Sequence, residues 1–358
     1  MNLVPHDPKT GRATFCLNMI VRDEAHVIER CLNSAKPLID FVRIIDTGST
    51  DDTVHLIRSW CFTNAVNCIV EKSKWVDFST NRNEALALAG RCEATHLLLI
   101  DADEVLHITN DEVSNLRPRL AATDQILFTF PMLHGNNVCT RTNLVRNLPG
   151  RLQYRYPMHE ELVLDGDPEL SLTMIGNPKD YAKGPHVTTP QDGARSQVPG
   201  RLERDLLVLS EAYRADENPR HLFYMGQLLR IGAHTNPDPE LWAMVRETYT
   251  AYLRAMAGNY QPHCYVAALW VARIMEMEGR DADKVIASYL RVHGFDPGRP
   301  EAMGCLANLC LEQGDVEKAR EFATRVEECR GSNNYAFLET KWYARAKEIL
   351  EQTKEKVC

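Results

Sequence analysis

Three acidic residues stand directly after a short run of apolar residues. The apolar run 97–100 is followed by Asp101, Asp103 and Glu104. A short continuous apolar run favours a buried strand, and open α/β sheets bind ligands at the carboxyl ends of their strands. Two carboxylates spaced Asp-x-Asp can bind one divalent cation, which can also take phosphate oxygens. The alternative is an acidic turn that merely caps the next helix.

Two further polar clusters also follow predicted strands. Residues 13–21 predict a buried strand that ends in the polar triplet 22–24. Residues 41–45 predict a second strand, which runs into a loop of hydroxyl, acidic and turn residues at 46–53. A third strand is predicted at 67–71.

Helices are predicted between these strands. Apolar residues at helical spacing indicate helices at 25–35 and 54–60, and a third helix is predicted at 77–88. Strands that alternate with helices indicate βαβ units and a parallel sheet, so the polar clusters should gather at one edge of it. The chain has neither G-x-G-x-x-G nor G-x-x-x-x-G-K-[ST], so no motif supports a dinucleotide or P-loop site.

Three of these segments together resemble the family 2 glycosyltransferases of the GT-A fold. They are residues 17–57, then DFSTNRNEALALA at 77–89, then HLLLIDADE at 96–104, in the order and spacing of that family. The resemblance implies a Rossmann-like, mostly parallel sheet. It also implies an activated sugar donor, most often a uridine diphosphate sugar, bound across the edge of the sheet and transferred with inversion.

The resemblance also implies roles for individual residues. Asp46 would contact the base or ribose of the donor, Arg82 would face the base or diphosphate, and Asp101 would lie near the donor sugar. Asp103 would bind Mn²⁺ or Mg²⁺. The implied donor-binding set is Asp23, Glu24, Asp46, Ser49, Arg82, Asp101 and Asp103.

Physical chemistry agrees with these roles. A diphosphate leaving group gains negative charge as the glycosidic bond breaks, and a metal ion and an arginine aimed at it stabilise that charge. The alternative for Arg82 is an exposed helix residue that pairs with a nearby glutamate.

Short β segments separated by Pro and Gly follow at 126–130, 142–146, 152–156 and 161–164. They resemble the mixed extension of GT-A enzymes, and residues 146–162 resemble a segment of the subgroup that carries a helical tail. An inverting transfer needs a general base, for which Glu160 is the first candidate and Glu161 and Asp165 the next. Asp101 completes the expected catalytic pair. Alternatively, Glu160 is a surface acid and His159 packs locally.

His186 occupies the position where GT-A enzymes often supply a late histidine to the metal. Neutral imidazole is a suitable ligand for manganese. The family often reads I-x-H-x-G here, whereas this chain reads HVTTPQDG. Residues 188–200, rich in Pro, Gly, Gln and Ser, predict a loop that closes over the donor.

The second half of the chain follows the helical period. Residues 300–326 resemble one tetratricopeptide (TPR) repeat, and we expect a degenerate array of about three repeats over 201–352. The expected domains are therefore a GT-A domain at 1–200 and an all-α TPR-like domain at 201–358. Such arrays bind an extended chain or a partner protein; alternatively, the helices brace the catalytic domain or form a homodimer.

Composition excludes little. The chain is 44% hydrophobic and 25% charged, which is typical of globular proteins, and its net charge of −8 gives no global attraction to nucleic acid. No apolar run reaches the roughly 18 residues of a membrane span, and MNLVPHDPKTGR is unlike a signal peptide, so we expect a cytoplasmic protein. The 11 cysteines lack C-x-x-C pairs and are expected to be reduced.

The acceptor remains open at this stage. A polypeptide side chain suits the helical array, and the resemblance extends to bacterial enzymes that glycosylate peptides. A glycan suits the catalytic half equally, and a modified DNA base is a further candidate. The non-enzymatic alternative is a helical-repeat scaffold with a relic sugar-nucleotide fold, which the retention of Asp46, Arg82, Asp101 and Asp103 disfavours. A nucleotidyltransferase is disfavoured by the absence of a Gly-rich phosphate loop.

Overall fold

The structure is a computed structural model that describes residues 12–134, 137–139, 141–165, 172–175, 184–190, 192–329 and 341–354. The chain divides into two compact units, residues 1–201 and 202–358, and each is described by itself.

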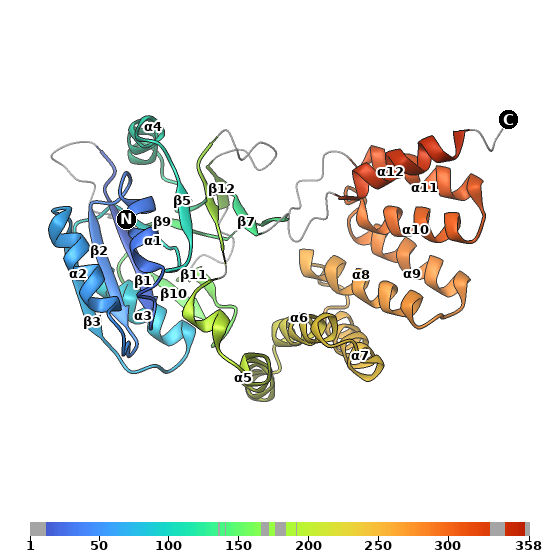
Figure 1. Ribbon diagram of the computed structural model, residues 1–358, viewed down its shortest axis with the longest axis horizontal. Coiled ribbons are helices and arrows are strands. Elements are labelled where there is room, and N and C mark those ends of the chain that lie inside the picture. The colour runs from blue at the N-terminus through green and yellow to red at the C-terminus, as the bar shows by residue number, and fades with distance from the viewer. Residues whose placement is uncertain are drawn as a thin grey trace. The chain divides into compact units, whose positions relative to one another are not determined.

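The first unit is built on a seven-stranded sheet with the order β12-β6-β9-β4-β1-β2-β3 (Figure 1). Its strands are β1 (Phe15–Val21), β2 (Phe41–Asp46), β3 (Asn67–Lys72), β4 (His96–Leu98), β6 (Leu127–Thr129), β9 (Leu144–Arg146) and β12 (Leu172–Met174). Strands β1 to β4 pair in parallel, whereas β9 runs antiparallel to both β4 and β6. The expected mostly parallel α/β sheet is confirmed.

Helices cover both faces of this sheet because the side chains of β1 alternate between them. Phe15, Leu17 and Met19 are buried in one cluster with α1 (Ile28–Ala35), α2 (Thr53–Thr63) and α4 (Asn110–Ala121). Cys16 faces the other way and packs with residues of α3 (Phe78–Ala89). Successive side chains of a strand point to opposite faces, so one apolar strand holds the two layers together.

Local signals fix where these helices begin. Asp77 caps α3 by accepting a hydrogen bond from the Thr80 amide, and Thr109 and Glu112 form a reciprocal capping box at the start of α4. With α3 packed against the sheet through Leu86 and Ala89, Arg82 reaches Asp101 at the edge where the acidic residues lie.

Two smaller sheets lie beside the main one. The first has the order β5-β13-β7-β8 and consists of β5 (Val105–His107), β13 (His186–Thr188), β7 (Met132–His134) and β8 (Asn137–Cys139). The second is the antiparallel pair β10 (Leu152–Arg155) and β11 (Glu161–Leu164). The turn between β10 and β11 carries Glu160.

β3 lies at one end of the main sheet as the described residues form it, and Ile69 on it is 40% exposed. Two arginines donate to its backbone carbonyls: Arg58 of α2 to Val70, at 3.2 Å, and Arg43 of β2 to Asn67, at 3.1 Å. Side chains therefore satisfy carbonyl groups along this end strand.

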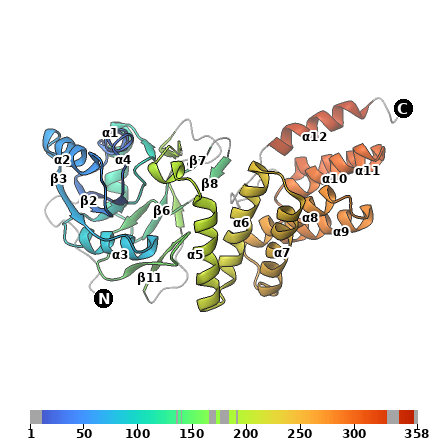
Figure 2. The same ribbon diagram turned by 60° about the horizontal axis from the view of Figure 1, so that its bottom comes forward.

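The second unit consists of consecutive paired helices (Figure 2). They are α5 (Arg201–Asp216), α6 (Pro219–Thr235), α7 (Pro239–Ala255), α8 (Pro262–Met277), α9 (Ala282–Phe295), α10 (Glu301–Glu312), α11 (Val316–Glu328) and α12 (Lys341–Gln352). Proline at the first turn of α6, α7 and α8 suits positions where the amide has no helical partner. The expected TPR-like succession is confirmed. No helix in the described part of the chain is long and apolar enough to cross a membrane.

Small residues allow these helices to cross closely. A β-carbon at Gly226 of α6 would lie 2.5 Å from the ring of Tyr249, and one at Gly304 of α10 would lie 2.3 Å from the ring of Trp342. Both aromatic side chains are buried in the core of the helical unit. The two glycines are therefore required by packing and not by backbone conformation.

We predict that Gly304→Ala destabilises the helical unit although alanine favours helix by roughly 1 kcal/mol. The added methyl group collides with Trp342, and such overpacking costs about 1–3 kcal/mol. Gly294→Ala is the matched control, because a β-carbon at Gly294 meets nothing within 4 Å, and it should be neutral or stabilising. Urea unfolding of both variants tests this; equal stability of the two would contradict the packing argument.

A second prediction concerns His96, whose side chain is 1% exposed between Phe15 and Phe128. Burial, and then the charge of Arg146, lower the pKa of His96 from 6.5 to about 3. Below pH 6.5, His96 is therefore protonated in the unfolded chain but stays neutral in the folded chain. The free energy of unfolding falls with decreasing pH as a result. We expect a slope on the order of 1 kcal/mol per pH unit between about pH 6 and 4.

Chemical unfolding measured across this pH range should show a shallower slope for His96→Leu than for the parent chain. His55→Leu, which alters an exposed residue of α2, should keep the parent slope. An unchanged slope in His96→Leu would show that other groups cause the acid sensitivity.

Candidate functional site

The polar clusters that follow β1, β2 and β4 meet at one edge of the sheet. The register pairs Val21 with Asp46, so the two following loops begin side by side. The Asp23 amide donates to Ser49 Oγ at 3.0 Å, and the Thr50 amide donates to Asp23 Oδ1 at 2.7 Å. Asp23 has φ 56°, a left-handed conformation that is uncommon outside glycine, and the bonds to the neighbouring loop hold it.

Asp46 is fully buried at the end of β2. Its Oδ1 accepts a hydrogen bond from the Ser49 amide at 3.0 Å, whereas its Oδ2 has no hydrogen-bond partner among the described residues. A buried acceptor without a donor costs free energy. A ligand that brings an N–H or O–H group, such as a nucleobase or a ribose, would remove that cost.

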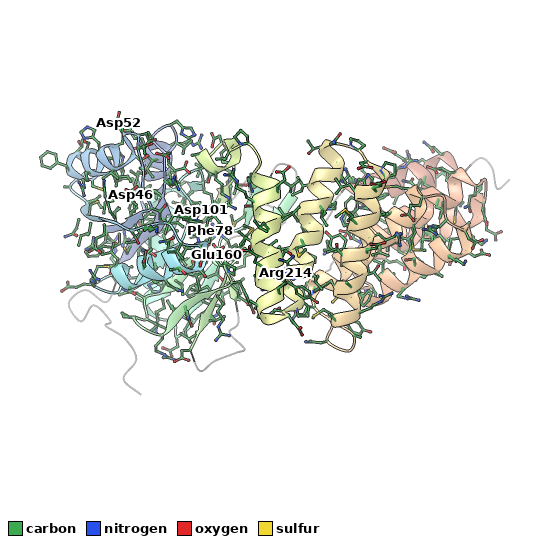
Figure 3. The ribbon with its side chains drawn as sticks, turned by 90° about the horizontal axis from the view of Figure 1, so that it is seen from below. Asp46, Asp52, Phe78, Asp101, Glu160 and Arg214 are labelled. Carbon is green, nitrogen blue, oxygen red and sulfur yellow. The ribbon has the colours of Figure 1, made fainter. Side chains whose placement is uncertain are left out.

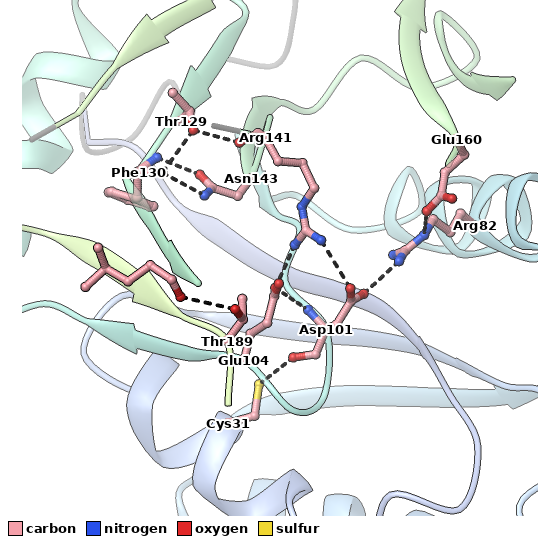
Figure 4. Close-up of polar contacts among 11 residues, drawn as sticks. Cys31, Arg82, Asp101, Glu104, Thr129, Phe130, Arg141, Asn143, Glu160 and Thr189 are labelled. Atoms are coloured by element: carbon pink, nitrogen blue, oxygen red, sulfur yellow. Dashed lines mark hydrogen bonds and ion pairs between the residues drawn. The ribbon is translucent and has the colours of Figure 1, made fainter. Parts of the chain in front are cut away.

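Asp101 is shared by two arginines (Figure 4). Arg82 Nη2 lies 2.7 Å from Asp101 Oδ1, and Arg141 Nη1 lies 3.2 Å from Asp101 Oδ2. Burial alone would raise the pKa of Asp101, but the two guanidiniums outweigh it and hold that pKa well below its usual range. Asp101 is therefore ionised and fixed in orientation.

The same arginines reach two further carboxylates. Arg82 Nε donates to Glu160 Oε1, and Arg141 Nη2 donates to Glu104 Oε2 at 2.6 Å. Arg82 also lies 5.8 Å from the centre of the Tyr154 ring. Figure 3 labels Asp46, Asp101 and Glu160, which all belong to the first unit. The acid-rich turn after β4 is thus part of a five-member ionic cluster, consisting of Arg82, Asp101, Glu104, Arg141 and Glu160.

Arg82 is not an exposed helix residue, and Glu160 is not a surface acid. Their side chains are 12% and 15% exposed, and each is paired within the cluster. The loop before Glu160 is strained, since Tyr156 and His159 have φ of 72° and 52°. Left-handed backbone at non-glycine residues is concentrated at functional sites, and here it precedes a carboxylate directed inward.

Residues 192–195, which we call the strap, cross the acidic edge. Asp192 is held by the guanidinium of Arg30, with contacts of 2.6 and 2.7 Å. The next two amides then donate to carboxylates: Gly193 to Asp103 Oδ2 at 3.3 Å and Ala194 to Glu24 Oε2 at 3.1 Å. A β-carbon at Gly193 would lie 2.9 Å from that Asp103 oxygen, so only glycine approaches so closely.

Asp103 and Glu24 differ electrostatically from Asp101. Burial, followed by neighbouring carboxylates, raises the pKa of both Asp103 and Glu24. In the described part of the chain, backbone amides contact these two carboxylates and no cationic side chain forms an ion pair with them, so their negative charge is undercompensated. An added divalent cation would correct this, and Mg²⁺ is often bound by one or two protein carboxylates together with substrate phosphates. The donor set around Asp103 fits such a cation.

The structure does not bring His186 to Asp103. His186 lies opposite His107 in the β5–β13 ladder, and His107 is four residues beyond Asp103 in the chain. The centroids of the two imidazole rings are 4.4 Å apart, and the rings are stacked. Thr188 occupies the opposite end of that ladder, towards Asp103. His186 Nδ1 also lies 2.9 Å from the Gly184 carbonyl. Across the described residues, no three His, Cys, Asp or Glu side chains form a metal-binding group.

Sequence reasoning missed Arg141, Arg30 and Asp192. Arg141 stands alone between short strands, and no motif distinguishes it from other surface arginines. Arg30 and Asp192 are 162 residues apart, and their pairing depends on tertiary structure. For Arg30, the signal would have been its place on the first helix after the polar triplet 22–24.

Comparisons with known proteins agree with this architecture. Residues 16–159 match the family described as Glycosyl transferase family 2. The SPbeta prophage-derived glycosyltransferase SunS of Bacillus subtilis is 26% identical over 234 residues, which are 64% of this chain and 52% of SunS. A TPR repeat-containing protein of Synechococcus elongatus is 34% identical over 153 residues, 41% of this chain and 35% of that protein. This chain thus spans about half the length of SunS, and less of the second relative.

Among solved structures, S. aureus TarS matches with 13% identity and a TM-score of 0.41, over 76% of this chain and 54% of TarS. A tetratricopeptide repeat protein from Parabacteroides merdae matches with 16% identity and a TM-score of 0.32, over 44% of this chain and 58% of that protein. The match at residues 16–159 covers every strand of the main sheet except β12, and it covers the acidic edge up to the residue before Glu160. Residues 16–159 thus carry the match to Glycosyl transferase family 2, and a TPR-like succession of paired helices follows them in the chain.

Proposed function

We propose that this chain transfers a sugar from a nucleoside diphosphate sugar to a nucleophile on a larger acceptor, with the help of a divalent metal ion. The observation that carries the proposal is the ionic cluster around Asp101 at the carboxyl edge of the sheet, next to the undercompensated Asp103. Such a cluster positions groups where charge develops in a transfer reaction.

The nucleoside end of the donor is assigned to the loops after β1 and β2. Asp46 offers to a base N–H or a ribose hydroxyl its Oδ2, which accepts no hydrogen bond from the residues that the structure describes. Asp23 and Ser49 bond to each other at the same edge and present further polar atoms. The resemblance seen in the sequence makes a uridine diphosphate sugar the donor to test first.

The metal is assigned to Asp103, with Mn²⁺ or Mg²⁺ as the candidate ion. When bound, the ion supplies positive charge to the leaving diphosphate. The ion needs a single protein carboxylate if phosphate oxygens and water complete its shell, which agrees with the absence of a three-ligand group among the described residues. His186 is left out of this assignment because its ladder position separates it from Asp103.

Glu160 is assigned as the general base. Its Oε1 accepts from Arg82, whereas Oε2 makes no hydrogen bond within the described part of the chain. Asp101 is a poorer proton acceptor, because two guanidiniums stabilise its ionised form. In the proposed step the acceptor bonds to the anomeric carbon and gives its proton to Glu160. The bond from that carbon to the β-phosphate oxygen breaks, and the electron pair leaves with the diphosphate.

The acceptor is proposed to be a macromolecule. TPR-like arrays bind extended chains, and a helical unit of this kind follows the catalytic unit directly. A polypeptide, a glycan and a DNA base remain the acceptor classes to compare.

We predict that the chain releases nucleotide slowly from one sugar nucleotide of a uridine, guanosine, adenosine and thymidine panel, with Mn²⁺ and without acceptor. A chelator should stop the release. Asp103→Asn should lower the metal-stimulated rate by roughly 100-fold or more, since it removes charge at the metal. The rate is followed by chromatography of the released nucleotide.

Asp124→Asn is the control, because the Asp124 side chain is fully exposed and its ion-pair partner, Arg146, is not a member of the cluster. Full activity of a folded Asp103→Asn variant would disprove the metal assignment. If no sugar nucleotide is cleaved and none raises the unfolding temperature, the helical-repeat scaffold becomes the better function.

We predict that Glu160→Gln lowers the rate of nucleotide release by about 10²-fold or more while the affinity for nucleotide stays within about twofold, as for loss of a general base. Glu161→Gln is the matched control, since Glu161 is exposed in the adjacent position and should keep the parent rate. Calorimetry gives the affinity and chromatography the rate. Equal effects of the two substitutions would remove Glu160 from the catalytic assignment.

A further inference from the structure

The two arginines bound to Asp101 differ in exposure. The Arg82 side chain is 12% exposed, and it donates from Nε to Glu160 and from Nη2 to Asp101. The Arg141 side chain is 41% exposed, and it contacts Asp101 and Glu104 through its two Nη atoms. A guanidinium has five N–H donors. Arg141 therefore keeps donors available at a solvent-facing position beside the reacting edge, whereas Arg82 is enclosed by its partners.

We propose that Arg141, and not Arg82, is the arginine that contacts the diphosphate of the donor. This assignment rests on the proposed function, since it names a binding group for the same donor. Arg82 instead positions Asp101 and Glu160.

Charge supports this division. Within the cluster three carboxylates, Asp101, Glu104 and Glu160, face two guanidiniums. A diphosphate that approaches such an acidic edge is repelled unless a cation is turned towards it. Arg141 is the more exposed of the two, and planar guanidinium groups bind phosphate oxygens in a bidentate manner.

The backbone around Arg141 is fixed in a way that suits a binding group. The Arg141 carbonyl accepts a hydrogen bond from Thr129 Oγ1 at 2.7 Å. Two residues later, Asn143 Oδ1 accepts from the Phe130 amide at 2.8 Å, and its Nδ2 donates to the Phe130 carbonyl at 3.3 Å (Figure 4). These bonds fasten the segment to the end of β6, so the guanidinium is preorganised and loses little freedom on binding.

The competing role for Arg141 is a clamp that neutralises Glu104, which is 4% exposed. A clamp would affect all ligands of the edge through local disorder. A diphosphate contact would affect only ligands that carry the β-phosphate. The two roles therefore separate when UDP is compared with UMP and uridine.

The experiment is calorimetric titration of UDP, UMP and uridine in Mn²⁺ against the full chain and its variants. Arg141→Ala should weaken UDP binding by about 10- to 100-fold, the loss expected for hydrogen bonds to a charged group. UMP and uridine should change by less than about twofold, since neither carries the β-phosphate. Arg141→Lys keeps the charge and should recover part of the UDP affinity, but not the bidentate component.

Two further variants serve as controls. Arg82→Lys should leave the ratio of UDP to UMP affinity unchanged, and Arg91→Ala, an arginine whose side chain is 64% exposed, should behave as the parent chain. If Arg141→Ala does not fold, Arg141→Lys carries the test, and a UDP-to-UMP ratio equal to that of the parent overturns the proposal. Equal loss of all three ligands also overturns it and supports the clamp. If the parent chain binds no uridine, guanosine, adenosine or thymidine diphosphate, the proposed function itself fails, and this outcome is distinct from the others.

Discussion

The organisation of the first unit, residues 1–201, depends on one carboxylate, Asp101, held between two guanidiniums. Arg82 comes from α3, Arg141 from the segment before β9, and Asp101 from the end of β4. The two arginines extend the network to Glu160 and Glu104. A charge pair removed from water is strongly destabilised when one partner is lost, because the other stays behind uncompensated. The cluster therefore ties a helix, two strand ends and a turn into one arrangement.

The edge of the sheet separates two kinds of acid. Asp101 and Glu104 have guanidinium partners, whereas Asp103 and Glu24 are met by the backbone amides of Gly193 and Ala194. Amides carry partial charge, so they satisfy hydrogen bonds without neutralising a carboxylate. Asp101 and Glu104 are held in place by ion pairs. Asp103 and Glu24 keep a negative charge that the amides do not neutralise. This difference separates the carboxylates of the ionic cluster from Asp103, to which we assign the cation.

Much of the fold could be predicted from sequence, because β1 and β4 are short continuous apolar runs and the helical unit follows the helical hydrophobic period. The gathering of residues 22–24, 46–53 and 101–104 at one edge also follows from parallel strands alone. The pairing of Arg82 with Glu160, 78 residues away, depends on how a strained turn between β10 and β11 folds back. The register of β13 against β5, which sets His186 against His107, has no local signal, since three-residue strands carry no period. Arg141 was not predicted because it lies outside the helices and strands, where no sequence period indicates which way a side chain points.

The end strand β3 has a consequence for association. An end strand presents unpaired carbonyl and amide groups that can form hydrogen bonds with another extended chain. On β3 the exposed side chain of Ile69 adds an apolar contact surface. Here Arg58 and Arg43 already donate to the Val70 and Asn67 carbonyls. A strand from a second molecule would have to displace the Arg58 side chain before it could pair with the Val70 carbonyl. In the folded first unit, Arg58 thus makes the end of the sheet a poorer template for edge-to-edge association.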